Sequence, residues 1–178
     1  MGTKELRPGA GVPAPAKMVN VYHLTCYKGA LGMDTKTVKK YILDMEGNYS
    51  ETVLDHANNP RNVGSIPEAD GFGEGTGECE DIMVLWLRVV NDLITGATFW
   101  TDGCGTTIAC GSMVTELAKG KTVKEAFLIG REEILQALGG LPEKSVHCAA
   151  LAAGALKNAL QDYLEIKRFP WKKAYRQE

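Results

Sequence analysis

The sequence has no strong charge of either sign, no long apolar run and no paired cysteines. Its 178 residues carry a formal net charge of -2, which gives no reason to expect nucleic acid as a partner. No apolar stretch approaches the roughly 20 residues that span a bilayer, so we expect no membrane partner. The chain also shows no secretory signal, which favours a cytoplasmic protein. It contains no internal repeat.

The cysteines are few and scattered. The five thiols stand at positions 26, 79, 104, 110 and 148. An odd number of widely separated cysteines is a poor disulfide framework, and the paired C-x-x-C spacing of a zinc ribbon is missing. In a reducing compartment, cysteines of this kind are more often metal ligands or reactive thiols than disulfide partners.

Composition divides the chain near residue 33. Residues 1–33 include "RPGAGVPAPAK", a stretch without apolar periodicity, and we expect a disordered or loosely attached extension there. Met18 and Met33 are alternative starts, so this extension is also open to interpretation as a start-site artefact. Cys26 and His23 belong to it and are given no role. Residues 34–178 form the predicted folded domain.

The order of the predicted elements favours an α+β fold. One or two helices are expected within residues 33–60, one before residue 48 and one that ends at Pro60. The glycine- and proline-rich residues 61–78 are interpreted as a loop. Residues 81–90, "DIMVLWLRVV", are typical of a strand; "NDLITG" is interpreted as a turn and "ATFWTD" as a second strand. We expect a small antiparallel sheet of about three strands, packed against several helices.

The chain after residue 105 is predicted to be helical. Gly120 should end a first helix, and two short helices follow. A long C-terminal helix is predicted from an apolar stripe. The stripe contains Leu156, Leu160, Tyr163 and Leu164.

Three cysteines stand at junctions between predicted elements. Cys79 closes the glycine-rich loop before a strand, Cys104 lies between two glycines before a helix, and Cys148 precedes the last helix. A helix N-terminus favours thiolate over thiol, so we expect thiolates at Cys104 and Cys148. Cys110, six residues into the helical stretch, should point away from Cys104 and is interpreted as a core thiol.

Two further ligand types accompany these thiols. Asp81 follows Cys79 at i+2, a spacing that places both on one face of a strand, and His147 precedes Cys148. Thiolates suit Zn²⁺ or iron–sulfur clusters. Each motif alone is more often a tight turn or a buried thiol, and only the combination favours a shared site. His56 is interpreted as structural.

Four motifs, in this order, resemble those of the NifU/IscU-type iron–sulfur cluster assembly scaffolds. The resemblance extends from about Tyr49 to about Tyr163. The four stretches are "YSETVLDHANNPRNVGSI", "GTGECED", "DGCGTTIACGSMVTE" and "HCAALA". They are similar to the family's opening helix and turn and to its three cysteine segments.

This resemblance implies a scaffold without turnover of its own. Cys79, Cys104 and Cys148 match the family's three cluster-binding cysteines, Asp81 its aspartate and His147 its histidine. A cysteine desulfurase would supply sulfur, with Cys148 as the expected first acceptor. Iron would join it, and a transient [2Fe–2S] cluster would pass to acceptor apoproteins. A homodimer sharing one cluster is compatible with this ligand set.

The sequence also departs from the family pattern. Glu80 replaces the glycine of the usual Cys-Gly-Asp, and only Leu141 and Pro142 remain of a Leu-Pro-Pro-Val-Lys motif that docks a DnaK-type chaperone. We therefore do not expect that chaperone as a partner. The alternative function is a zinc-binding sulfurtransferase partner that holds Zn²⁺ firmly while Cys148 accepts persulfide.

Overall fold

The computed structural model describes residues 49–175 and confirms the α+β class. Residues 1–33, the predicted start of the domain at residue 34 and the helix expected before residue 48 lie outside the described residues. The first described element is helix α3, Glu51–Asn58. The side chain of Ser50 caps it by accepting a hydrogen bond from the backbone N–H of Val53 at 3.1 Å.

The sheet contains three antiparallel strands in the order β1-β2-β3. They are β1 Gly71–Thr76, β2 Ile82–Val90 and β3 Leu93–Thr101. The turn between β2 and β3 is shorter than predicted, because Asn91 and Asp92 alone make it, with φ of 52° and 62°. Two left-handed residues form the two-residue hairpin turn whose twist matches the strands. The residues from Leu93 to Gly96 therefore belong to β3.

Strand β1 corrects the prediction that residues 61–78 form only a loop. Glycine is uncommon in strands because it leaves no side chain to pack, and here the packing explains its presence. A Cβ on Gly71 would lie 2.4 Å from the backbone oxygen of Ala159, and one on Gly73 would lie 2.2 Å from the backbone nitrogen of the same residue. The glycines let the last helix lie directly on the strand.

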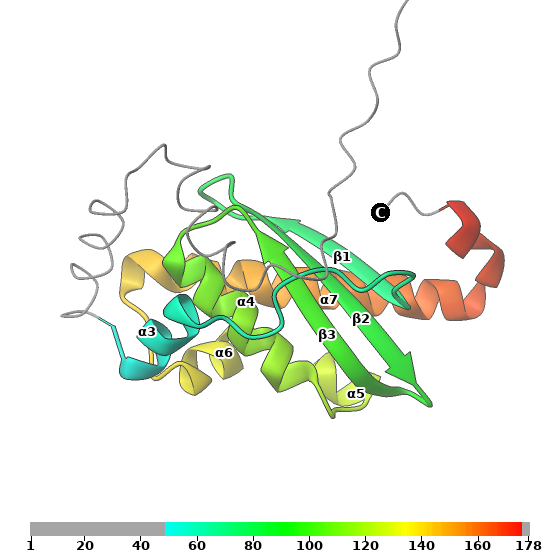
Figure 1. Cartoon of the computed structure of the whole chain (residues 1–178), viewed down its shortest axis with the longest axis horizontal. Helices are drawn as coiled ribbons and strands as arrows, with labels where there is room; N and C mark the ends of the chain where they lie inside the picture. Colours follow the sequence, from blue (N-terminus) through cyan, green and yellow to red (C-terminus); the bar gives the residue numbers. More distant parts are fainter. Residues whose placement is uncertain (1–48, 176–178) are drawn as a thin grey trace, which may run out of the picture.

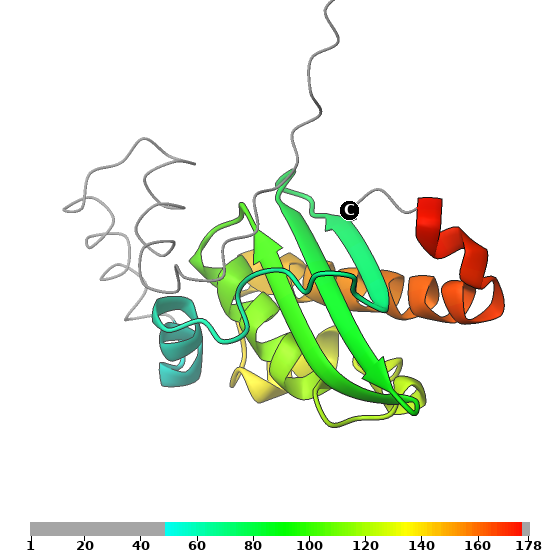
Figure 2. The same ribbon diagram turned by 45° about the vertical axis from the view of Figure 1, so that its right-hand side comes forward.

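The helices after the sheet confirm the predicted order. They are α4 Gly105–Ala118, α5 Val123–Ala126, α6 Arg131–Ala137, the 3₁₀ turn η1 Glu143–Ser145, α7 Val146–Arg168 and the 3₁₀ segment η2 Pro170–Tyr175. Figure 1 shows α7 running along the length of the molecule behind the strands, and Figure 2 shows the sheet covering α4 and α7 on one side.

The buried stripe of α7 differs in part from the prediction. Leu156 and Leu160 are fully buried, whereas Leu164 is 43% exposed. Residues at i+4 rotate by about 40° around a helix, so Leu164 has turned away from the sheet. Ala155 and Ala159 take the centre of the contact, where only small side chains fit.

Two groups of apolar side chains stabilise the fold. The larger lies between the sheet and the helices and includes Phe99 and Leu85. The smaller lies on the other face of the sheet, where Trp86 packs edge-to-face on Phe72 with ring centroids 5.9 Å apart. None of the helices within residues 49–175 is long and apolar enough to cross a membrane.

Candidate metal and sulfur site

Cys79 lies in the tight turn that joins β1 to β2. The N–H of Gly77 donates to the carbonyl of Asp81 at 2.8 Å, and the N–H of Glu80 donates to the carbonyl of Gly77 at 3.1 Å. The predicted reason for pairing Cys79 with Asp81, a shared strand face, is therefore wrong, since β2 begins only at Ile82. Glu80 has φ of 62°, a left-handed conformation that glycine adopts without strain.

Cys104 occupies the N-cap position of α4. The helix begins at Gly105, and the Cys104 side chain makes no capping hydrogen bond. The free backbone N–H groups of the first turn point toward the end of the helix where this sulfur lies. Cys104 is also exposed to solvent, so the position favours a reactive or ligating thiolate.

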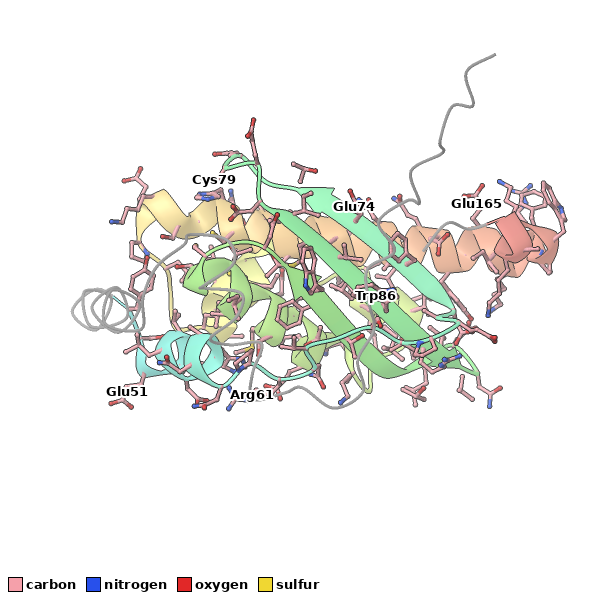
Figure 3. All side chains as sticks on the ribbon, turned by 45° about the horizontal axis from the view of Figure 1, so that its top comes forward. Glu51, Arg61, Glu74, Cys79, Trp86 and Glu165 are labelled. Carbon is pink, nitrogen blue, oxygen red and sulfur yellow. The ribbon has the colours of Figure 1, made fainter. Side chains whose placement is uncertain are left out.

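His147 and Cys148 lie in the first turn of α7, which begins at Val146, one turn earlier than the sequence indicated. Cys148 is only 2% exposed. The turn also lies beside the β1–β2 hairpin, since Cys79 Sγ is 3.3 Å from His147 Nε2. Figure 3 shows Cys79 at the end of the molecule opposite to Glu165, which lies near the far end of α7.

A chain of short contacts joins all five predicted site residues. His147 Nε2 lies 3.5 Å from Cys148 Sγ, in addition to its contact with Cys79. Three further contacts pass through Thr107, whose Oγ1 lies 3.4 Å from Cys148 Sγ, 3.5 Å from Cys104 Sγ and 3.0 Å from Asp81 Oδ2. The structure therefore brings together residues from three separate segments.

Thr107 is the residue at this site that sequence reasoning missed. It is fully buried in the first turn of α4, three residues after Cys104. The glycine before Cys104 makes room for it, because a Cβ on Gly103 would lie 2.6 Å from Asp81 Oδ2 and 2.7 Å from Thr107 Cβ. A threonine near a helix start is commonly a cap, so nothing in the sequence distinguished this one.

The pKa values of the neighbouring thiols Cys104 and Cys148 are shifted in opposite directions. A hydrogen bond from the Cys148 thiol, with help from Thr107 and the backbone N–H groups of Thr107 and Thr106, lowers the pKa of Cys104 to about 5, although partial burial acts the other way. The same bond to Cys104, followed by burial, raises the pKa of Cys148 above its usual range. The prediction of a thiolate at Cys148 is therefore wrong. In this arrangement Cys148 keeps its proton and shares it with the Cys104 thiolate through a hydrogen bond.

The ligand types are gathered but do not form a closed cage. Within residues 49–175, no three cysteine, histidine or acidic side chains surround one point closely enough to hold a metal ion. Asp81 and Cys148 are engaged by Thr107, and Cys79 contacts His147. Three thiols, one carboxylate and one imidazole suit iron or zinc, and binding requires small changes in the hairpin and the helix starts.

Two other candidate residues have structural roles. Cys110 is completely buried in the core, and burial raises the pKa of its thiol, as expected for a core cysteine. His56 is buried between α3 and α4, where Nδ1 lies 2.8 Å from Ser112 Oγ and Nε2 lies 3.6 Å from Glu116. Cys26 and His23 lie outside the described residues.

A hollow of about 340 Å³ opens next to His147, between the end of β1 and α7. Its lining includes the small residues Gly75, Ala150 and Gly154 as well as Glu78. Cys79, the residue that follows Glu78 in the hairpin, is exposed to solvent.

Comparison with known proteins shows which family this chain is similar to. The model of the NifU-like N-terminal domain family matches residues 48–169. The iron-sulfur cluster assembly scaffold protein IscU 1 of Archaeoglobus fulgidus is 49% identical over 116 residues, covering 65% of this chain and 76% of that protein. The scaffold protein IscU of Haemophilus influenzae is 46% identical over 121 residues, covering 65% and 94%.

Solved structures show the same fold. The crystal structure of a putative iron-sulfur cluster assembly scaffold protein for the SUF system, from Fervidobacterium islandicum, is 25% identical and superposes with a TM-score of 0.52. It covers 63% of this chain and 96% of that one. Since the family match spans most of the chain, this protein belongs to the NifU-like N-terminal domain family.

Proposed function

We propose that this protein is a scaffold on which iron and sulfur are assembled into a transient [2Fe–2S] cluster. One observation carries the proposal: the residues that meet at the end of the molecule are three thiols with one carboxylate and one imidazole, joined by a continuous set of contacts. Curated relatives with 46–49% identity are named as cluster assembly scaffolds.

In this proposal Cys79, Cys104 and Cys148 bind iron through their thiolates, and bound sulfide completes the cluster. Asp81 supplies a hard oxygen ligand, which binds iron less firmly than a thiolate does. His147 lies between two of the thiols and offers an imidazole nitrogen to the same iron. A mixed ligand set of this kind favours a cargo that can be released.

Sulfur enters through Cys148, which accepts it from the persulfide of a cysteine desulfurase. Attack requires the thiolate, and the imidazole of His147, whose Nε2 lies 3.5 Å from Cys148 Sγ, is the neighbouring base that takes up the Cys148 proton. The Cys148 sulfur then bonds to the outer persulfide sulfur, while the sulfur–sulfur bond to the desulfurase breaks and leaves its cysteine as a thiolate. Cys148 must also become more exposed than its present 2%.

The protein has no turnover of its own in this proposal, since the desulfurase performs the chemistry and acceptor apoproteins receive the product. The exposed Cys79 and the hollow beside His147 give a partner access to the site. Two chains facing each other share one cluster in this proposal, because residues 49–175 of one chain form no closed cage. A reducing compartment such as the cytoplasm keeps the thiols available.

The test is anaerobic incubation with Fe²⁺, cysteine, a cysteine desulfurase and a thiol reductant, which reduces the persulfide sulfur to sulfide. Iron, zinc and acid-labile sulfide are then analysed. We expect equal amounts of iron and sulfide with the visible absorption of a [2Fe–2S] cluster. Cys104→Ser should lose both. Cys110→Ala is the matched control, because it removes a buried thiol outside the site, and it should load like the native protein.

Two other outcomes would contradict the proposal. Tightly held zinc without bound sulfide, together with a persulfide on Cys148 detected by mass spectrometry, would favour the zinc-binding sulfurtransferase partner. Zinc whose removal unfolds the protein, without any sulfur transfer, would indicate a structural metal domain.

A further inference from the structure

The Thr107 hydroxyl occupies the centre of the site. Its Oγ1 lies within hydrogen-bonding distance of a carboxylate oxygen and of two sulfurs, at 3.0, 3.4 and 3.5 Å. A hydroxyl has one proton to donate, so these three groups compete for it. Bonds to ionised acceptors are the strongest, and the shortest of the three distances is to Asp81.

This position indicates how Asp81 is held. The described residues give the Asp81 side chain one hydrogen bond, the one from Thr107. Gly103 has no Cβ, and the space that a Cβ would need is filled by Asp81 Oδ2 and by the Thr107 side chain. The carboxylate is thus drawn from the hairpin toward the sulfurs of Cys104 and Cys148, and away from solvent.

We propose that Thr107 is a positioning residue that keeps the Asp81 carboxylate in reach of the cargo iron. The inference rests on the proposed function and adds to it. When iron is bound by the thiolates, a carboxylate held at this place can bind the same iron and exchange for water or for a ligand of an acceptor.

Since Thr107 acts by holding Asp81, substitutions at the two residues should change the lifetime of the cluster in the same way. Asp81→Ala removes the exchangeable oxygen ligand, so the cluster should persist longer. Thr107→Val keeps the shape of the side chain and removes the hydroxyl, which leaves Asp81 without its anchor. The cluster should therefore also persist longer in Thr107→Val, and the two changes should not add.

The experiment is a double-mutant cycle on reconstituted full-length protein. The measured quantity is the half-life of the visible cluster absorption in the presence of EDTA. We expect each single variant to lengthen it by about tenfold, the factor that corresponds to one hydrogen bond to a charged group. The double variant should match Asp81→Ala alone, and Thr107→Ser should restore the native half-life.

Thr115→Val is the matched control. Thr115 is also buried in α4 and its hydroxyl donates to the carbonyl of Ser112 at 2.8 Å, far along the helix from the site. It should leave the half-life unchanged even if it lowers the melting temperature. Should Thr107→Val not fold, Thr107→Ala removes the same hydroxyl without placing a methyl group in its position.

The outcomes separate the two proposals. If the native protein takes up no iron and sulfide, the proposed function fails and the role of Thr107 fails with it. If the native protein loads and Thr107→Val has the native half-life, or if the effects of Thr107→Val and Asp81→Ala add fully, only the role of Thr107 is overturned.

Discussion

Cys79 Sγ lies 3.3 Å from Nε2 of His147, although 68 residues separate them in the chain. This contact joins the β1–β2 hairpin to the first turn of α7. The side chains of Glu78, Cys79 and Glu80 are all exposed at the tip of this hairpin. The imidazole therefore bridges an exposed thiol and a buried one, since it also lies 3.5 Å from Cys148 Sγ.

The lowered pKa of Cys104 predicts that this thiol is alkylated already at mildly acid pH. Since its pKa is about 5, the thiolate should predominate above that value. With iodoacetamide followed by peptide mass spectrometry, the rate at Cys104 should rise with a midpoint near pH 5 and be nearly constant from pH 6.5 upward. Cys148 should react last among the site thiols, because its pKa is raised and it is buried. Equal rates at both sites would contradict the shared proton.

The left-handed backbone of Glu80 predicts that a glycine stabilises the hairpin. A non-glycine residue at φ of 62° is strained, and the gain from Glu80→Gly exceeds the entropy that glycine loses on folding. We expect the free energy of unfolding to rise by about 0.5–1 kcal/mol in urea denaturation. Glu78→Gly, in the same turn but without a positive φ, should lower it instead. A loss of stability in both variants would argue against strain at Glu80.

The contact between β1 and α7 predicts opposite effects for two glycine substitutions. Gly73→Ala would place its Cβ 2.2 Å from the backbone of Ala159 and should destabilise the protein by about 3 kcal/mol or more. Gly154→Ala meets no atom within 4 Å and lies inside α7, so it should stabilise by about 1 kcal/mol. Thermal and urea unfolding measure both, and a mild effect at Gly73 would mean that the helix can move off the strand.

Burial of His56 predicts a loss of stability in mild acid. Burial, and secondarily Arg61, lowers its pKa below the ordinary 6.5, so the folded protein resists the proton that the unfolded chain accepts. The contribution is complete above pH 6.5 and declines as the pH falls toward the folded pKa. Urea unfolding between pH 7.5 and pH 5 should show a steeper loss for the native protein than for His56→Gln. Parallel pH dependences of the native protein and His56→Gln would contradict this explanation.

Much of the fold follows from local patterns. The apolar run of residues 81–90 predicted β2. Gly120 predicted the end of α4, and an apolar stripe predicted α7, because burial of one helix face imposes a period on the sequence. The glycine stretch of β1 could not be read in this way. Glycine is required there because the backbone of Ala159, nearly 90 residues away in the chain, leaves no room for a Cβ. A local sequence pattern cannot predict such a contact.

The site was predictable as a set of residue types and not as a geometry. The thiols, Asp81 and His147 stood out because their chemistry is unusual at junctions between elements. Thr107 did not, since its importance comes from three neighbours that only the folded chain supplies. The raised pKa of Cys148 escaped for the same reason: the helix N-terminus favours a thiolate, but the adjacent Cys104 thiolate outweighs it.

The direct backbone contact between β1 and α7 limits which parts of the site can move. At Gly71 and Gly73 the strand lies directly on the backbone of α7 around Ala159, so the strand and the helix shift together. The hairpin with Cys79 continues from this strand, and Cys148 lies on this helix. Cys104 comes from α4, outside that pair. When the site opens for a partner, Cys104 and Thr107 on α4 therefore move relative to Cys79 and Cys148, which move together.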